Sequence, residues 1–129
     1  MKMHHIAIAT HCIDSVLLKY QYLGYSIGEL IQDTKRNVQI CFIKNGDFTL
    51  ELVEPLSDNS PVSAILKNSV QDSLYHICYS VENIEKTIEN LETQGYLKIS
   101  SLDFAPAIHN RRVVFMFEKD LGLIELVED

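Results

Sequence analysis

The sequence predicts an α+β fold built from two tandem βαβββ modules, which together supply eight strands. Three observations predict this fold. The chain contains an internal duplication, most of its strand-like segments alternate apolar and polar residues, and each copy holds one helix-like segment that ends at a glycine. We expect one domain over residues 1–129, with module one at about 3–54, a linker at about 55–73 and module two at about 74–129.

The duplication becomes visible when the two halves of the chain are aligned. Three pairs of segments match: HHIAIA (4–9) with YHICYS (75–80), QYLGYSIGEL (21–30) with TQGYLKISSL (93–102), and DFTLELVE (47–54) with LGLIELVE (121–128). The histidines, the Gly-Tyr pairs and both glutamates of ELVE then fall in equivalent places, apart from a small insertion late in the second copy. Chance would hardly keep so many matches in register, so the modules are two copies of one unit.

The first copy reads as a strand, a helix and three strands. HIAIA (5–9) alternates as a strand does. IDSVLLKYQYL (13–23) has apolar residues at helical spacing, with Asp14 and Ser15 as N-terminal caps and Gly24 at its end. Three further strands are predicted at 26–31, 38–43 and 48–54, with the hairpin signal KNGD (44–47) between the last two.

The second copy repeats this order. Its helix is predicted at 83–94, where Ile84, Ile88 and Leu91 share one face before Gly95. Its strands are predicted at 75–81, 97–102, 112–117 and 123–128. The segment between the copies contains two prolines and many Ser, Asp and Asn residues, which mark a linker with a short helical turn at VSAILK (62–67).

Charge and composition limit the classes of function. The net charge is −7, and the basic residues are scattered apart from one Lys-Arg and one Arg-Arg pair. The negatively charged phosphate backbone of nucleic acid should therefore repel the protein. No stretch is long and apolar enough to span a membrane, and the start shows no export signal. Cys12, Cys41 and Cys78 lie in or next to apolar runs, which indicates buried reduced thiols and a cytoplasmic location.

Strand alternation separates small residues from large apolar ones. In the first strand of module one, His5 shares a face with Ala7 and Ala9, while Ile6 and Ile8 point the other way. The first strand of module two repeats the pattern around His76. The large apolar face must pack on the helix, so the face with the histidine can line a hollow.

The last strand of each module adds a glutamate, Glu51 in the first copy and Glu125 in the second. If the modules pack around an approximate two-fold axis, His5, Glu51, His76 and Glu125 meet in one cluster. Imidazole and carboxylate together suit Zn²⁺, Ni²⁺, Co²⁺, Mn²⁺ or Fe²⁺. A single strand histidine is more often an ordinary core or surface residue, but its repetition in both copies favours a metal site.

These segments resemble the vicinal oxygen chelate superfamily, which contains glyoxalase I, methylmalonyl-coenzyme A epimerase, extradiol dioxygenases and antibiotic-resistance proteins. HHIAIAT, LELVEPLSDNSPVSAIL, YHICYSVENIEKTIENLETQGY and GLIELVE are most similar to the epimerase branch. The resemblance covers nearly the whole chain and implies a curved eight-stranded mixed sheet around a metal cavity. It also implies one divalent ion, Co, Ni, Zn or Mn, bound by His5, Glu51, His76 and Glu125. The chain differs from the epimerase pattern at DTKRNVQ (33–39) and APAIHNRRVVFMFEKD (105–120).

The resemblance implies a metal-dependent isomerase or epimerase that moves a proton at a carbon next to a carbonyl. The ion would stabilise the enolate, and Glu51 and Glu125 would act as the bases. Gln39 and Arg112, on neighbouring strands, are weaker candidates for orienting the substrate, which we expect to be an acyl-coenzyme A or another thioester. The habit of the superfamily and the exposed strand edges predict a homodimer.

Other functions fit the same fold. A lactoylglutathione lyase (glyoxalase I) also uses two histidines and two glutamates, but no motif here identifies a glutathione site. A non-catalytic small-molecule-binding or resistance protein commonly lacks the metal residues, and the intact set of four argues against it. Extradiol ring cleavage usually needs four modules and a site with one carboxylate. The sequence therefore favours the epimerase over these alternatives.

Overall fold

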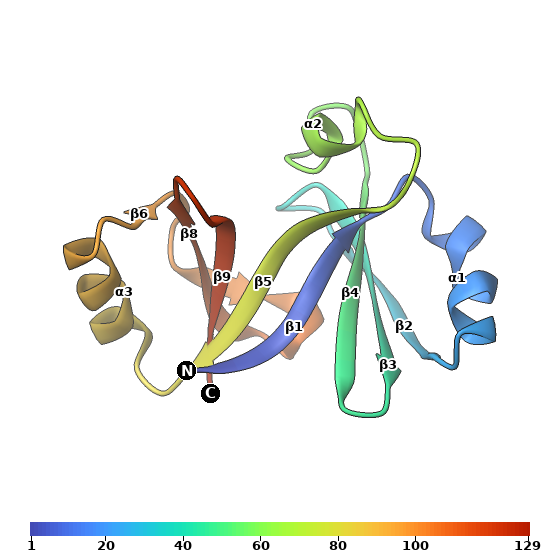
Figure 1. Ribbon diagram of the computed structural model, residues 1–129. Coiled ribbons are helices and arrows are strands. Elements are labelled where there is room, and N and C mark those ends of the chain that lie inside the picture. The colour runs from blue at the N-terminus through green and yellow to red at the C-terminus, as the bar shows by residue number, and fades with distance from the viewer. The chain divides into compact units, whose positions relative to one another are not determined.

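The computed structural model describes residues 1–129 and consists of nine strands, three α-helices and one 3-10 helix (Figure 1). The strands are β1 (Lys2–Ala9), β2 (Ser26–Asp33), β3 (Val38–Asn45), β4 (Phe48–Pro55), β5 (Ser73–Val81), β6 (Leu97–Lys98), β7 (Asp103–Ala105), β8 (Arg111–Glu118) and β9 (Gly122–Glu128). The helices are α1 (Ile13–Tyr22), α2 (Ser63–Leu66), α3 (Ile84–Thr93) and the 3-10 helix Pro106–Ile108. None of the helices has the length and apolar character needed to cross a membrane.

The chain divides into two compact units, which we call the first unit (residues 5–75) and the second unit (residues 1–4 with 76–129). Strands of the first unit follow the order β2, β3, β4, β1, and those of the second unit follow β5, β9, β8, β6, with β7 also paired to β8. β1 runs parallel to β4 and β5 runs parallel to β9, whereas the other pairs are antiparallel. This repeated topology confirms the predicted α+β class.

One helix covers one face of the sheet in each unit. α1 buries Ile13 with Cys41, Ile43 and Leu52 in the first unit. In the second unit α3 contributes Ile84 and Ile88 to a cluster whose other buried members are Val81, Val114, Met116, Ile124 and Leu126. Because side chains alternate along a strand, the strand residues between these core positions face away from the helix.

Both long helices end at a glycine, as predicted. Gly24 after α1 and Gly95 after α3 have φ values of 97° and 91°. The N–H of the tyrosine that follows each glycine donates to a carbonyl one turn back, Tyr25 to Tyr20 and Tyr96 to Leu91, both at 3.1 Å. Side chains other than glycine are strained at such φ values, so glycine suits this kind of helix end.

The start of α1 differs from the prediction. Asp14 and Ser15 lie inside the first turn, and Cys12 occupies the capping position without a side-chain capping bond. Glu54 of β4 instead accepts the Ile13 N–H at 2.7 Å. The predicted caps are wrong because a carboxylate from a strand distant in sequence already satisfies the first N–H group of the helix.

The start of α3 has the same device together with a local cap. Glu128 of β9 accepts the Ile84 N–H at 3.3 Å, and Asn83 accepts the Lys86 N–H at 2.9 Å. The final glutamate of each ELVE repeat therefore binds a helix N-terminus, where its negative charge also interacts favourably with the helix dipole.

Replacing Glu54 by alanine should lower the free energy of unfolding by about 1–3 kcal/mol, because the N–H of Ile13 loses its acceptor. Glu54→Gln keeps an acceptor oxygen and should lose less. Urea denaturation measures both differences, with Glu29→Ala at an exposed β2 position as the control. Equal losses for Glu29→Ala and Glu54→Ala would contradict the capping role.

The second unit holds one strand more than the predicted eight-stranded arrangement allows, because the predicted strand 97–102 is interrupted. Lys98 lies opposite Met116, and Asp103 lies opposite Val113. The segment from Lys98 to Asp103 therefore contains more residues than the β8 segment that it faces. Between these pairs the Ser100 hydroxyl accepts the Phe115 N–H at 2.8 Å in place of a backbone carbonyl. The interruption leaves two short strands, β6 and β7, where one was predicted.

The linker forms the predicted helical turn as α2, and its end is bound to α1. The Tyr20 hydroxyl donates to Asp72 Oδ2 at 3.0 Å. Burial and this hydrogen bond to a carboxylate raise the pKa of Tyr20. None of the three cysteines is in a disulfide. Cys41 and Cys78 are buried as predicted, whereas Cys12 is exposed, because it precedes α1 instead of lying in a strand.

Candidate active site

The first unit pairs a histidine with a glutamate on the sheet face opposite α1. His5 lies on β1 and Glu51 on the parallel neighbour β4, where it is opposite Ala7. His5 Nε2 is 2.6 Å from Glu51 Oε2, and the two residues are 1% and 5% exposed. Ala7 and Ala9, on the same face of β1 as His5, are small and fully buried.

The second unit repeats the pair on the equivalent strands. His76 lies on β5 and Glu125 on β9, where it is opposite Cys78. His76 Nε2 is 3.2 Å from Glu125 Oε2, and both residues are buried. Each predicted histidine thus meets the predicted glutamate of its own unit.

A phenylalanine supports each pair. Phe42 lies opposite Glu51, and Phe115 lies opposite Glu125. Their rings meet His5 and His76 edge to face, in both cases with centroids 5.1 Å apart. Sequence reasoning missed these residues, although each is the fifth residue of its strand segment, VQICFI (38–43) and RRVVFM (111–116). Edge-to-face contacts of this kind stabilise the observed orientation of each imidazole.

The chemistry of each pair fits a divalent metal ion. Burying a carboxylate is costly unless it is paired with positive charge or coordinates a metal. The imidazole nitrogen and the carboxylate oxygen of each pair are ligand atoms that zinc, cobalt, nickel and manganese accept. Their atoms already approach within hydrogen-bonding range, so an ion could replace that contact with modest side-chain movement.

Gln39 and Arg112 lie on the helix-covered side of their sheets. Gln39 Nε2 donates to Glu54 Oε2 at 3.2 Å. Arg112 donates to both carboxylate oxygens of Glu128, at 2.7 and 2.8 Å, and also binds Glu85 of α3. These bonds lower the pKa of Glu85 and raise that of Arg112. Both residues support the glutamates that bind the helix starts, and their predicted contact with substrate stays a prediction.

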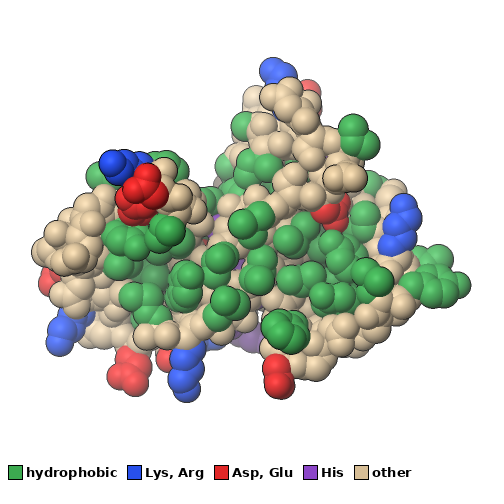
Figure 2. Space-filling view, in the orientation of Figure 1, with side chains coloured by type: hydrophobic (Ala, Val, Ile, Leu, Met, Phe, Trp, Pro, Cys, Tyr) green, Lys and Arg blue, Asp and Glu red, His purple; other side chains and the backbone are tan.

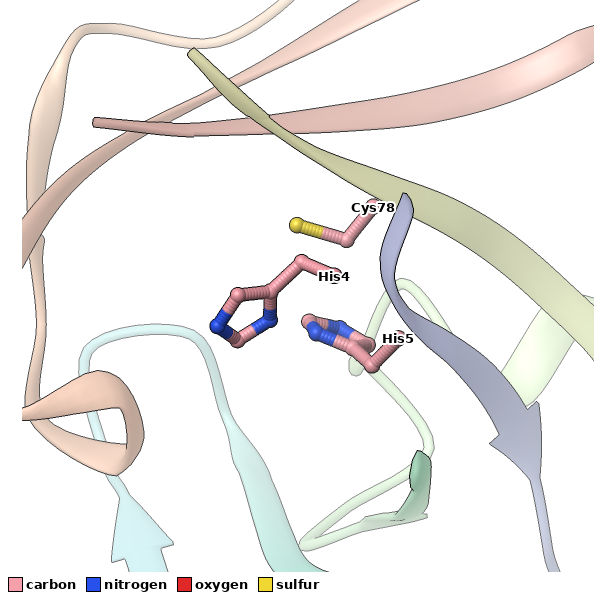
Figure 3. A group of neighbouring side chains, drawn as sticks. All are labelled: His4, His5 and Cys78. Atoms are coloured by element: carbon pink, nitrogen blue, oxygen red, sulfur yellow. The ribbon is translucent and has the colours of Figure 1, made fainter. Parts of the chain in front are cut away.

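His4 belongs to a different cluster in the second unit. Its Nε2 lies 3.3 Å from Arg111 Nη1, and a ring nitrogen lies within 4.8 Å of the buried Cys78 sulfur (Figure 3). Arg111 also donates to the Glu128 carbonyl at 2.6 Å and to Asp129 Oδ1 at 3.1 Å. Arg111 therefore fastens the first residues of the chain to the last ones.

The chain is similar in sequence to known proteins. Residues 4–115 match the family model described as the Glyoxalase/Bleomycin resistance protein/Dioxygenase superfamily. The chain is 30% identical to human mitochondrial methylmalonyl-CoA epimerase over 130 residues, which cover 97% of this chain and 72% of the human protein. It is 28% identical to an ethylmalonyl-CoA/methylmalonyl-CoA epimerase from Cereibacter sphaeroides over 128 residues, 97% of this chain and 96% of that protein.

A solved structure shares the fold. The structure is a methylmalonyl-CoA epimerase in complex with methylmalonyl-CoA and NH4+, and it matches with a TM-score of 0.85 at 20% identity. The match covers 99% of this chain and 94% of that protein.

Proposed function

Since the chain belongs to the glyoxalase/bleomycin resistance/dioxygenase superfamily, we propose that it is a metal-dependent epimerase of methylmalonyl-coenzyme A or a closely related thioester. The observation that carries the proposal is the buried His–Glu pair that occurs once in each unit. The names of the curated relatives support the reaction and the substrate class. The chain spans 72% of the human protein and 96% of the Cereibacter sphaeroides protein.

We further propose that His5, Glu51, His76 and Glu125 bind one divalent ion, Co, Ni, Zn or Mn. When bound, such an ion acts as a Lewis acid that stabilises negative charge developing on a carbonyl oxygen. The duplication supports this set, because two related modules supply identical ligand types from equivalent strands.

In this proposal Glu51 and Glu125 are the two bases. One carboxylate removes the proton from the carbon between the thioester and the second carbonyl group, and the other carboxylic acid returns a proton to the opposite face of that carbon. The configuration at carbon then inverts without any change in composition.

The proposal extends to the oligomeric state of the protein and to its location in the cell. We propose that the chain works as one catalytic domain and as a homodimer, as the superfamily habit suggests. The buried cysteines Cys41 and Cys78, which form no disulfide, favour a reducing compartment such as the cytoplasm.

Hydrogen-deuterium exchange tests the function. The wild-type protein, loaded with Co²⁺ after treatment with a chelator, is incubated in D₂O with methylmalonyl-CoA, and uptake at the carbon between the carbonyl groups is followed by mass spectrometry. We expect metal-dependent uptake and loss of enantiomeric purity. Activity on the methylglyoxal-glutathione hemithioacetal in place of this exchange would favour a lactoylglutathione lyase. Binding without any turnover would favour a non-catalytic protein.

A further inference from the structure

The sheet face that holds His76 and Glu125 continues as an apolar surface toward the edge of the second unit. Leu123 of β9 lies opposite Phe117 of β8, which lies opposite Leu97 of β6. Directly opposed residues of antiparallel strands share a face, so these three side chains form one row. On the parallel strands β5 and β9, Ile77 lies opposite Ile124, and both point to the helix-covered face. His76 and Leu123, each one residue earlier, therefore share the opposite face, and the row begins at His76.

A second row runs beside the first. It begins at Glu125, which lies opposite Phe115 of β8. The Ile99 N–H donates to the Phe115 carbonyl at 3.0 Å, so Ile99 continues this row past the end of β6. The two rows therefore extend from the His76–Glu125 pair across β9 and β8 to the strand edge.

Exposure rises along the rows. His76 and Glu125 are buried, Phe117 is 37% exposed, and at the edge Ile99 and Leu97 are 55% and 62% exposed. Phe117, Ile99 and Leu97 are among the large hydrophobic residues that are exposed. Figure 2 shows one side of the molecule, on which hydrophobic side chains lie among charged ones. An apolar surface of this kind, continuous with a buried polar pair, indicates a binding surface.

The first unit does not repeat the apolar row. At the equivalent places the row from β4 to β2 consists of Thr49, Lys44 and Ser26, which lie opposite one another in turn. A purely structural need for apolar side chains at these sheet positions should act on both copies alike. The difference therefore points to a requirement that the second copy alone meets.

We infer that this apolar surface binds the alkyl substituent on the reacting carbon, and that the protein acts on 2-alkylmalonyl-coenzyme A thioesters with substituents longer than ethyl. The inference rests on the proposed function and deepens it. Strands are about 4.8 Å apart, so the row from β5 to β6 spans roughly 14 Å. A methyl group reaches little of it, whereas a propyl or butyl group can lie along Leu123 and Phe117 toward Leu97.

The test compares substituents on one carrier. Binding of methyl-, ethyl- and butylmalonyl-CoA is measured by calorimetry, and kcat/KM for exchange is measured in parallel. In wild type, each added methylene should raise affinity about two- to fourfold until the row is filled. Leu97→Ser and Ile99→Ser should lower the butyl-to-methyl affinity ratio about three- to tenfold. The control Leu121→Ser changes a leucine of similar exposure, 67%, in the β8–β9 turn of the same unit and should leave the ratio unchanged.

Three outcomes would overturn the inference. The first is no gain in affinity with alkyl length. The second is that Leu97→Ser weakens the binding of all three coenzyme A thioesters equally and does not weaken the binding of the corresponding N-acetylcysteamine thioesters. The surface would then bind the coenzyme A arm. The third is a Leu97→Ser variant that dissociates a dimer without changing the ratio. Because calorimetry needs no turnover, an inactive wild type that still shows the length dependence would refute only the proposed epimerase activity.

Discussion

Replacing Glu125 by glutamine is expected to lower the rate of epimerisation by about 10²–10⁴-fold, because the amide cannot take up a proton from carbon. Exchange with solvent should persist for one of the two enantiomers, the one that Glu51 deprotonates. Glu51→Gln should give the mirror result and leave exchange with the other enantiomer only. Deuterium uptake from D₂O, measured separately on the two enantiomers of methylmalonyl-CoA, records this reciprocity.

The reciprocity distinguishes two bases from one base. If one glutamate removed the proton from both faces of the carbon, its replacement would abolish exchange with both enantiomers. Replacement of the other glutamate would then not select one enantiomer over the other. Glu92→Gln, at an exposed position of α3, controls for the loss of one negative charge. Glutamine keeps the volume of the side chain and an oxygen that can still act as a ligand, so the variants are expected to fold and to retain the metal more firmly than alanine variants.

The duplication made most of the fold predictable. Gly24 and Gly95 mark the helix ends in sequence because the backbone conformation they adopt is a local property that only glycine takes easily. Likewise the alternation around His5 and His76 identifies the face that turns away from the helix, since alternation requires no knowledge of the partner strand.

Features that depend on contacts distant in sequence were not predictable in this way. Nothing local shows that Glu54 accepts the N–H of Ile13, because the two residues meet only when β4 lies beside the start of α1. The interruption between β6 and β7 depends on the Ser100 hydroxyl, which accepts the Phe115 N–H where a regular strand would offer a backbone carbonyl. Strand propensities do not indicate that a side chain takes this place. Phe42 and Phe115 carry a signal only when the two copies are aligned, as both lie in ordinary apolar strands.

Saturation with a divalent ion is expected to raise the free energy of unfolding by about 4 kcal/mol when the free ion is at 1,000 times its dissociation constant. Chelator-treated wild type, titrated with Co²⁺ or Zn²⁺ during urea denaturation, provides the measurement. His5→Ala and His76→Ala should each remove most of this increase, even though the two histidines belong to different units. Tyr22→Ala, at an exposed position of α1, should leave the increase intact.

The two histidine variants decide between one shared ion and two separate ones. If each His–Glu pair bound its own ion, wild type would take up two ions per chain, and His5→Ala would keep the contribution of the His76–Glu125 pair. A shared ion requires one ion per chain and nearly equal losses from either variant, because removal of any ligand weakens the single site. Equal losses would then also support the proposed roles of Glu51 and Glu125, since bases on opposite faces of one carbon require that both pairs act on the same substrate molecule.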